Sequence, residues 1–258
     1  MNSEIPRFAS PELAREFQLP PIPEQEPQAG LVLERSLTGE LQVRLLRAQT
    51  GGPPPRPFSV DFTTSAFTRR QQEGKRSLLG RAVGLAKGAR PLIWDATLGF
   101  GRDAMGLALL GARIRGFERD RVVLALLEDG LERARDLGPP FREAIEERWE
   151  LSFGDAKVAL RTLAEGGWPA ARPEVILLDP MFPDRGSALA KREAQVLAAL
   201  CGVGGDVREE SALFIAAWES EVKRIVVKRP RIAPTIVEEP KPNQRFEGKS
   251  VRYDLYLR

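Results

Sequence analysis

Residues 179–183, Asp-Pro-Met-Phe-Pro, place a carboxylate and an aromatic ring on a turn stiffened by two prolines. They directly follow an apolar run, residues 174–178, of the kind found in a strand that is covered on both faces. The Asp179 carboxylate and the Pro180 carbonyl can accept hydrogen bonds from an exocyclic amino group, and Phe182 can stack on the base that carries it. Such a site positions the amino nitrogen for an in-line group transfer, which needs no strong base. The alternative is a helix-capping aspartate beside a phenylalanine of the core.

A second set of candidate residues surrounds a glycine-containing turn at residues 95–103, Asp-Ala-Thr-Leu-Gly-Phe-Gly-Arg-Asp. Gly99 and Gly101 permit a tight turn and a close approach of the backbone to a ligand. Glu118 ends the next apolar run, about fifteen residues beyond the turn, where its carboxylate can accept hydrogen bonds from both hydroxyls of a ribose. The turn and the carboxylate together indicate a ligand that contains a ribose. The alternative is a turn that only packs a strand on a helix.

The acidic residues of this region distinguish between two ribose-containing cofactors. The dinucleotide fingerprint is G-x-G-x-x-G, which lets a diphosphate reach the N-terminus of a helix. Here Ala104 stands at the third glycine position, and Asp103 would repel a diphosphate. Asp95, Asp103 and Glu118 instead suit a ligand that bears an ammonium, a sulfonium and a ribose diol. S-adenosylmethionine carries all three groups.

Two further residues can complete this ligand site. Asp155 follows the apolar run at residues 150–153 and can accept a hydrogen bond from an adenine amino group, while the backbone N–H of Ala156 can donate one. Asp155 could equally cap the helix that begins after it.

Cationic residues follow two of the predicted strands. Lys228 and Arg229 lie where the strand predicted over residues 224–228 ends, and they are expected to contact RNA phosphates near a flipped base. Lys191 and Arg192, soon after the Asp-Pro-Met-Phe-Pro turn, are expected to do the same. The alternative in each case is a charge pair at the end of an element.

The residue types that the chain lacks exclude whole classes of chemistry. Its 258 residues include no histidine and one cysteine, Cys201. The chain therefore has no Ser-His-Asp triad, no imidazole metal ligand, no internal disulfide and no thiolate zinc cluster, and no metal is expected. Methylation at C5 of cytosine would need a cysteine nucleophile in the reaction turn. Cys201 lies beyond the following helix and is expected to be a small, buried apolar residue.

Basic residues are concentrated in two segments. Residues 56–90 contain 8 basic and 2 acidic residues, and residues 221–258 contain 10 basic and 5 acidic residues. The remainder contains 21 basic and 29 acidic residues, so it is acidic. This segregation favours a positive face for a polyanion on an acidic body. The alternative is two solvated charged faces that never meet in space.

The candidate residues follow elements that alternate between strand and helix. This alternation predicts an α/β fold, a doubly wound parallel sheet closed by an antiparallel pair, in which ligands bind at the carboxyl ends of the strands. The expected strands are residues 92–96, 113–118, 150–153, 174–178 and 224–228. The expected helices are residues 103–110, 121–135, 156–164, 187–200 and 209–219. A hairpin is expected over residues 245–257, with its turn at 248–249.

The first part of the chain has a different character. Residues 30–48 predict two strands around a turn at 37–39, and residues 58–62 predict another strand. Apolar spacing after residue 69 predicts a helix over about 78–86. We therefore expect a small N-terminal β-containing unit, residues 1–66, attached to a larger domain, residues 67–258.

Neither a membrane span nor a secretion signal is expected. No stretch approaches the roughly 20 apolar residues of a transmembrane helix. The first ten residues contain Glu4 and Pro6 and lack the apolar core of a signal peptide. We expect a cytoplasmic protein.

Four stretches together resemble the J-type small-subunit ribosomal RNA (guanine-N2)-methyltransferase family. They are residues 95–103, Phe117-Glu-Arg119, Leu178-Asp-Pro-Met-Phe-Pro183 and Val226-Val-Lys-Arg-Pro230, with Val60-Asp-Phe62 and Arg252-Tyr-Asp254 as weaker matches. The resemblance implies a class I, Rossmann-like methyltransferase fold and transfer from S-adenosylmethionine to N2 of a guanine in 16S ribosomal RNA, either naked or within the small subunit. It also implies cofactor contacts at Arg102, Asp103, Glu118, Arg119, Asp155, Ala156 and Asp179.

Two other functions are compatible with these residues. One is methylation of another amino group, in DNA adenine or a protein glutamine, although the two basic segments favour RNA. The other is a non-catalytic RNA-binding module. Replacement of Asp179 separates the two classes, because it should abolish transfer by an enzyme and leave binding by a module intact.

Overall fold

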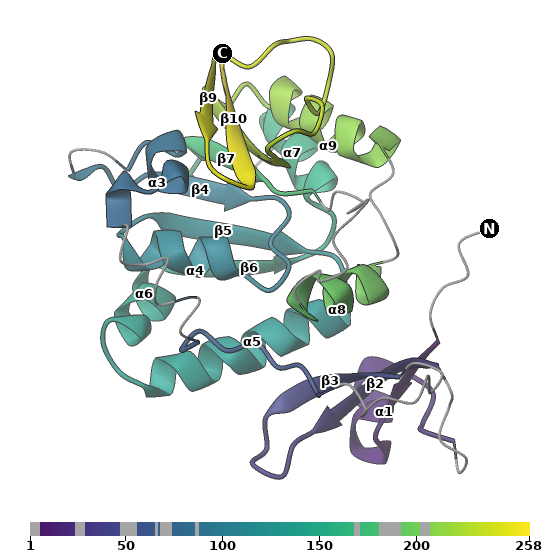
Figure 1. Ribbon diagram of the computed structural model, residues 1–258. Helices are drawn as coiled ribbons and strands as arrows, with labels where there is room; N and C mark the ends of the chain where they lie inside the picture. The colour runs from purple at the N-terminus through teal and green to yellow at the C-terminus, as the bar shows by residue number, and fades with distance from the viewer. Residues whose placement is uncertain are drawn as a thin grey trace.

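The computed structural model describes residues 6–23, 29–46, 56–64, 67, 74–85, 88–167, 171–180, 192–201 and 207–258. Most of them form a seven-stranded sheet with helices on both faces, and a smaller three-stranded sheet lies beside it (Figure 1). Within these residues, no helix is both long and apolar enough to cross a membrane.

The large sheet has the strand order β6-β5-β4-β7-β8-β10-β9. The strands from β6 to β8 are parallel, whereas β10 pairs antiparallel with both β8 and β9. The order reverses between β4 and β7, which is where sheets of this kind bind ligands. This confirms the expected doubly wound sheet and its closing hairpin. The strands are β4 (Leu92–Asp95), β5 (Arg113–Glu118), β6 (Trp149–Phe153), β7 (Val175–Leu178), β8 (Arg224–Pro230), β9 (Gln244–Glu247) and β10 (Val251–Leu257).

Successive residues of the central strands face two separate apolar cores, as the alternation of side chains along a strand requires. In β4, Ile93 belongs to one core and Trp94 to the other. The Ile93 side is covered by α3, α4, α5, α6 and α8, and the Trp94 side by α7 and α9. These helices are α3 (Leu78–Ala82), α4 (Arg102–Leu109), α5 (Arg121–Asp136), α6 (Phe141–Arg148), α7 (Ala156–Ala164), α8 (Arg192–Cys201) and α9 (Val207–Glu219).

Three helical regions differ from the expectation. The helix expected over 78–86 is shorter, because α3 ends before Gly84, whose φ of 83° lies in the left-handed region, and the 3-10 turn η1 (Gly74–Arg76) precedes it. α6 was not expected at all, although Phe141, Ala144 and Ile145 have helical spacing. The expected start of α8, residues 187–191, lies outside the described residues.

The N-terminal unit contains β1 (Arg7–Ala9), α1 (Pro11–Phe17), β2 (Gly30–Arg35) and β3 (Leu41–Leu46). The two strands expected within residues 30–48 are confirmed as the antiparallel pair β2–β3, and β1, which was not expected, pairs parallel with β2. The strand expected over 58–62 does not form. Only Phe58 pairs with the sheet, through two 2.8 Å hydrogen bonds with Val43, and Pro57 before it has no N–H to extend the ladder.

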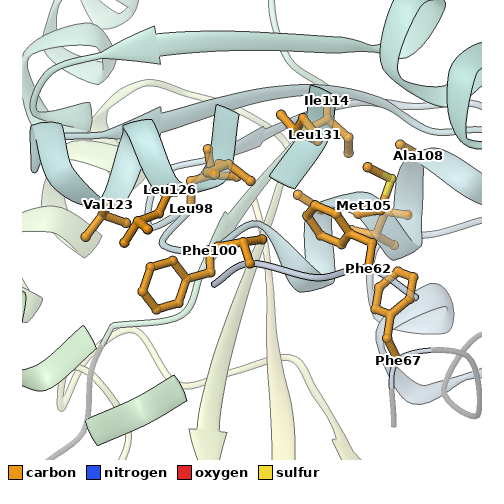
Figure 2. Close-up of a cluster of buried hydrophobic side chains, with 14 of the residues drawn as sticks. Phe62, Phe67, Leu98, Phe100, Met105, Ala108, Ile114, Val123, Leu126 and Leu131 are labelled. Atoms are coloured by element: carbon orange, nitrogen blue, oxygen red, sulfur yellow. The ribbon is translucent and has the colours of Figure 1, made fainter. Parts of the chain in front are cut away.

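The N-terminal segment packs into the larger core. Val60 lies against α5, where a Cβ on Gly130 would meet the Val60 carbonyl oxygen at 2.8 Å, and Arg133 donates a 2.6 Å hydrogen bond to the same oxygen. Phe62 and Phe67 lie beside Met105 of α4 (Figure 2). One apolar cluster therefore contains side chains of both sheets.

Candidate cofactor and reaction site

Buried apolar side chains anchor the glycine turn after β4, and its two glycines adopt the left-handed backbone conformation that the turn needs. Leu98 and Phe100 point into the core beside Val123 and Leu126 of α5 (Figure 2). The glycines between and after them have φ values of 52° at residue 99 and 67° at residue 101, in the left-handed region that glycine adopts at little cost. The turn therefore presents its backbone toward the carboxyl edge of the sheet, as expected.

Glu118 is fixed by this turn. It is 7% exposed, and its Oε2 accepts a 3.0 Å hydrogen bond from the Gly99 N–H while Oε1 accepts a 2.8 Å bond from the Asp120 N–H. Burial raises the pKa of Glu118 above its usual value. A carboxylate has about four lone-pair positions, so these two bonds leave capacity for hydroxyl donors of a ligand.

Two carboxylates contact one ammonium beside the glycine turn. The Lys228 Nζ lies 2.7 Å from Asp103 Oδ2 and 2.7 Å from Asp179 Oδ2. Asp179 is also held through its backbone, because its N–H donates a 2.6 Å hydrogen bond to the Thr97 hydroxyl. Thr97 was not among the predicted site residues, although a hydroxyl within a strand-end turn is a usual partner for neighbouring backbone. The site thus joins the glycine turn directly to the Asp179 turn.

Asp95 completes the group at the end of β4. It is 4% exposed and accepts a 3.1 Å hydrogen bond from the Thr97 N–H. Burial, followed by the nearby charges of Asp103 and Asp179, raises the pKa of Asp95 to about 7, against the lowering effects of the Thr97 N–H and Lys228. Among the described side chains, these carboxylates therefore carry more negative charge than Lys228 balances.

Asp155 caps the N-terminus of α7, which was one of the two roles expected for it. Its carboxylate accepts a 2.9 Å hydrogen bond from the Lys157 N–H at the start of α7, and Ala156 is buried as the first residue of that helix. Arg119 is exposed and lies 3.8 Å from Glu209. These placements leave the cofactor contacts of the three residues as predictions.

Arg102 links α4 to other parts of the chain. Its Nε donates a 2.6 Å hydrogen bond to Glu193 of α8, and its Nη1 donates a 2.7 Å bond to the Asp61 carbonyl. The expected cofactor contact of Arg102 also stays a prediction.

The expected phosphate contact of Arg229 is wrong. Arg229 is 3% exposed and donates to Glu210 at 2.7 Å and to the Pro234 carbonyl at 3.3 Å. Lys228 is likewise held by Asp103 and Asp179 rather than presented outward. Neighbouring residues of a strand face opposite sides, so Lys228 reaches the site while Arg229 reaches α9.

Five other residues were expected at the site or in the core. Phe182 and Lys191 lie outside the described residues, and so does the side chain of Arg192. Pro180 directly follows Asp179 and is half-buried. Cys201 ends α8 and is exposed, so its expected burial is wrong.

The two basic segments do meet. α3 packs against the β9–β10 hairpin, where the Arg81 guanidinium lies 5.2 Å above the centre of the Phe246 ring. The hairpin turn is near the carboxyl end of β8, because Val251 pairs with Pro230 and the Arg231 N–H bonds the Ser250 carbonyl at 3.0 Å. The alternative of two separate charged faces is therefore wrong, and exposed cations gather beside the reaction edge.

Arg252 and Asp254 hold the loop that follows β8. Both are buried, and the Arg252 guanidinium bonds Asp254 at 2.9 and 3.0 Å. The same guanidinium donates 2.7 Å bonds to the carbonyls of Arg231 and Ala233. This pair gives the Arg-Tyr-Asp stretch a structural role: it fixes the backbone that leads away from Lys228.

The described side chains fit S-adenosylmethionine. The excess negative charge of Asp95, Asp103 and Asp179 favours a cationic ligand and disfavours a diphosphate. Glu118, at the end of the neighbouring strand, can accept hydrogen bonds from a ribose. In the described part of the chain, no group of three or more acidic, cysteine or histidine side chains is arranged to hold a metal ion.

Known proteins of the same kind cover nearly the whole chain. The model of a SAM-dependent methyltransferase family matches residues 12–258. A protein of Dechloromonas aromatica called ribosomal RNA small subunit methyltransferase J is 42% identical over 257 residues, which are 97% of this chain and 96% of that one. Its namesake in Stutzerimonas stutzeri is 41% identical, over 91% of this chain and 86% of that one.

A solved structure agrees with these relatives. The crystal structure of a SAM-dependent methyltransferase from Neisseria gonorrhoeae matches with a TM-score of 0.70 and 30% identity, covering 97% of this chain and 95% of that one. The sheet order, the acidic carboxyl edge of the sheet and these matches lead to one conclusion: the chain belongs to the family of S-adenosylmethionine-dependent methyltransferases.

Proposed function

We propose that this enzyme transfers the methyl group of S-adenosylmethionine to the exocyclic N2 amino group of a guanine in small-subunit ribosomal RNA. The observation that carries the proposal is the shared ion pair of Asp103, Lys228 and Asp179. It puts an acceptor for an amino group next to carboxylates suited to a cationic cofactor. The relatives named ribosomal RNA small subunit methyltransferase J support the substrate, and the resemblance of the Asp-Pro-Met-Phe-Pro turn supports guanine N2.

The cofactor would be held by the residues around the glycine turn. Asp95 and Asp103 would face its ammonium and sulfonium, and Glu118 would accept hydrogen bonds from the ribose hydroxyls. Asp155 and the Ala156 N–H would face the adenine, with Arg102 and Arg119 as flanking contacts. When bound, S-adenosylmethionine supplies an electrophilic methyl group.

The substrate would be held by the turn after β7. Asp179 and the Pro180 carbonyl would accept hydrogen bonds from the two N–H groups of the guanine amino group, and Phe182 would stack on the base. These contacts draw the nitrogen lone pair out of conjugation with the ring and aim it at the methyl carbon. Positioning of this kind needs neither a histidine nor a metal.

The proposal also covers the division of the chain into domains and the location of the enzyme in the cell. The separate sheets support a division into a small N-terminal unit, residues 1–66, and a methyltransferase domain, residues 67–258. A ribosomal substrate, either free RNA or the assembled small subunit, would place the enzyme in the cytoplasm. Exposed cations near the reaction edge, Arg231 and Lys249, replace Arg229 as candidates for phosphate contacts.

The test is transfer of labelled methyl groups to small subunits from cells that lack the gene, followed by nucleoside digestion and mass spectrometry. We expect label in N2-methylguanosine, and loss of at least 100-fold in rate for Asp179→Ala with the fold intact. Asp136→Ala, at an exposed position of α5, is the matched control. Label in another nucleoside, in DNA or in protein would contradict the assigned acceptor, and full activity of Asp179→Ala would contradict the assigned role.

A further inference from the structure

The Lys228 ammonium contacts a carboxylate from each half of the site. It lies on β8, with Tyr253 of β10 as its register partner on one side and β7 on the other. Its side chain is 21% exposed, and its Nζ is 2.7 Å from a carboxylate of α4 and 2.7 Å from the carboxylate that follows β7. Asp103 belongs to the cofactor side and Asp179 to the substrate side.

This geometry fixes Asp179 at two points. The Thr97 hydroxyl accepts the Asp179 N–H, and the Lys228 ammonium holds Oδ2 of the carboxylate. Because the same ammonium also holds Asp103, a shift of either carboxylate relative to the other breaks a short, charge-assisted hydrogen bond. The distance between the cofactor side and the substrate side is thereby set by a single side chain.

We propose that Lys228 is a positioning residue of the methyl transfer, which locks the Asp179 carboxylate to Asp103 so that the acceptor nitrogen and the methyl donor are held in line. The inference rests on the proposed function for its substrate, and on the ion-pair geometry for its placement. A lysine with only a packing role would not need to contact carboxylates from both sides of the site, whereas the Lys228 ammonium contacts Asp103 and Asp179.

The charges that face Asp95 make this role of Lys228 measurable through the pH dependence of cofactor binding. They are Asp103 on α4, Asp179 after β7, and the Lys228 ammonium on β8; the Thr97 N–H bonds the carboxylate directly. Lys228 lowers the pKa of Asp95, so its removal takes a nearby positive charge away from all three carboxylates. Asp95 of the free protein should then lose its proton, and so favour a cationic ligand, only at a higher pH.

The experiment compares Lys228→Met, which keeps an unbranched apolar stem, with Lys228→Arg, which keeps the charge. Lys223→Met is the control, because Lys223 is exposed at the opposite edge of the sheet, just before β8 begins. Two quantities are measured: the dissociation constant of S-adenosylmethionine against pH by calorimetry without RNA, and the single-turnover rate with both substrates saturating.

For Lys228→Met we expect the midpoint of the affinity-against-pH curve to rise by about one pH unit and the single-turnover rate to fall about 100-fold. Lys228→Arg should keep the midpoint and lose about tenfold in rate, because a planar guanidinium cannot hold both oxygens in the same geometry. Lys223→Met should change neither quantity. A folded Lys228→Met protein with an unchanged midpoint and rate would overturn the proposal.

A labelling experiment covers the case in which Lys228→Met does not fold. Lys228 of the wild-type protein should react with an amine-acylating reagent at least tenfold more slowly than Lys223, and Asp179→Asn should speed the reaction. Equal reactivity of the two lysines would also overturn the proposal. If no RNA accepts the methyl group while the midpoint still shifts in Lys228→Met, the proposed substrate fails and the placement of the carboxylates by Lys228 stands.

Discussion

The guanidinium of Arg7 lies 2.9 Å from the carboxylate of Asp120 and so joins the first strand of the chain to the edge of the cofactor site. Asp120 caps the N-terminus of α5, where its carboxylate accepts hydrogen bonds from the N–H groups of Val122 and Val123, and its own N–H donates to the Glu118 carboxylate. Arg7 also donates to the Leu200 carbonyl of α8. The N-terminal unit therefore braces the backbone that positions Glu118, the carboxylate proposed to bind the ribose.

Removal of this brace should weaken cofactor binding. Arg7→Met is expected to raise the dissociation constant of S-adenosylmethionine about two- to fivefold, because a partly exposed ion pair contributes up to about 1 kcal/mol. Calorimetry without RNA measures the effect. Arg15→Met, on the exposed side of α1, is the control and should leave the dissociation constant unchanged. Equal affinities for the two variants would show that the N-terminal unit does not influence the cofactor site.

Cofactor affinity should depend on pH through Asp95. The pKa of this buried carboxyl is raised to about 7, so the free protein carries a neutral Asp95 below that pH and an anionic one above it. A cationic ligand binds the anionic form more tightly, and affinity should therefore fall about tenfold for each pH unit below 7. Calorimetric titrations from pH 5.5 to pH 8.5 test this, and a flat profile over that range would contradict it.

The same carboxyl should make the free enzyme less stable at alkaline pH. Its folded pKa of about 7 lies above the ordinary value of 3.8, so the folded state holds the proton more tightly than the unfolded state. Stability therefore falls as pH rises from about 4 to 7 and stays lower above that range. Asp95→Asn should raise the free energy of unfolding at pH 8 by roughly 1–3 kcal/mol and abolish cofactor binding.

Urea titrations at pH 5 and pH 8 measure this difference. The advantage of Asp95→Asn over the wild-type protein should be larger at pH 8. Asp136→Asn, an exposed substitution on α5, should show no such pH dependence. A less stable Asp95→Asn protein at pH 8 would mean that the carboxylate stabilises the fold.

Two glycines with similar backbone angles should respond differently to alanine. Gly101 has a φ of 67°, and an added Cβ would lie 2.9 Å from Leu127 Cδ1 and 3.2 Å from the Trp149 ring. Gly138 has a φ of 82° and no atom within 4 Å of such a Cβ. Gly138→Ala should cost about 1 kcal/mol, for backbone strain alone, whereas Gly101→Ala should cost about 2–4 kcal/mol. Thermal unfolding of both variants tests the difference, and equal losses would show that the turn has room to relax.

The cations beside the hairpin turn should contribute to RNA affinity. Arg231 and Lys249 are exposed and adjacent through the bond between residues 231 and 250. Their joint replacement by alanine should reduce the slope of log K against log salt by about 1.4–1.8, as expected for two lost phosphate contacts. Lys223→Ala with Arg113→Ala, at the amino edge, is the matched control. An unchanged slope would place the RNA elsewhere.

Local signals account for what the sequence predicted well. β5 and α7 begin and end at the predicted residues, because an apolar strand run and an aspartate cap mark their limits. The glycine turn and Asp179 also fall at the predicted sheet edge. β1 could not be predicted in the same way, since three residues carry little periodicity and their pairing with β2 spans a loop.

Sheet order explains what the sequence left open at the site. That Lys228 stands between Asp103 and Asp179 depends on the adjacency of β8 and β7 and on the path of α4, which no local pattern encodes. The burial of Arg229 could have been predicted from the sequence. Strict alternation along β8 separates it from Lys228, and the apolar partners of its face lie under α9.

The long-range contacts of Arg7 bear on the order of events during synthesis. Its partners Asp120 and Leu200 come 113 and 193 residues later in the chain. The strands β1, β2 and β3 can pair early, but the surface on which they pack is not complete until α8 has emerged. Until then Leu31, Leu33 and Val43 lack their final neighbours, so the newly made N-terminal sheet exposes apolar surface. A chain that stops before α8 would therefore leave this apolar surface without part of its cover.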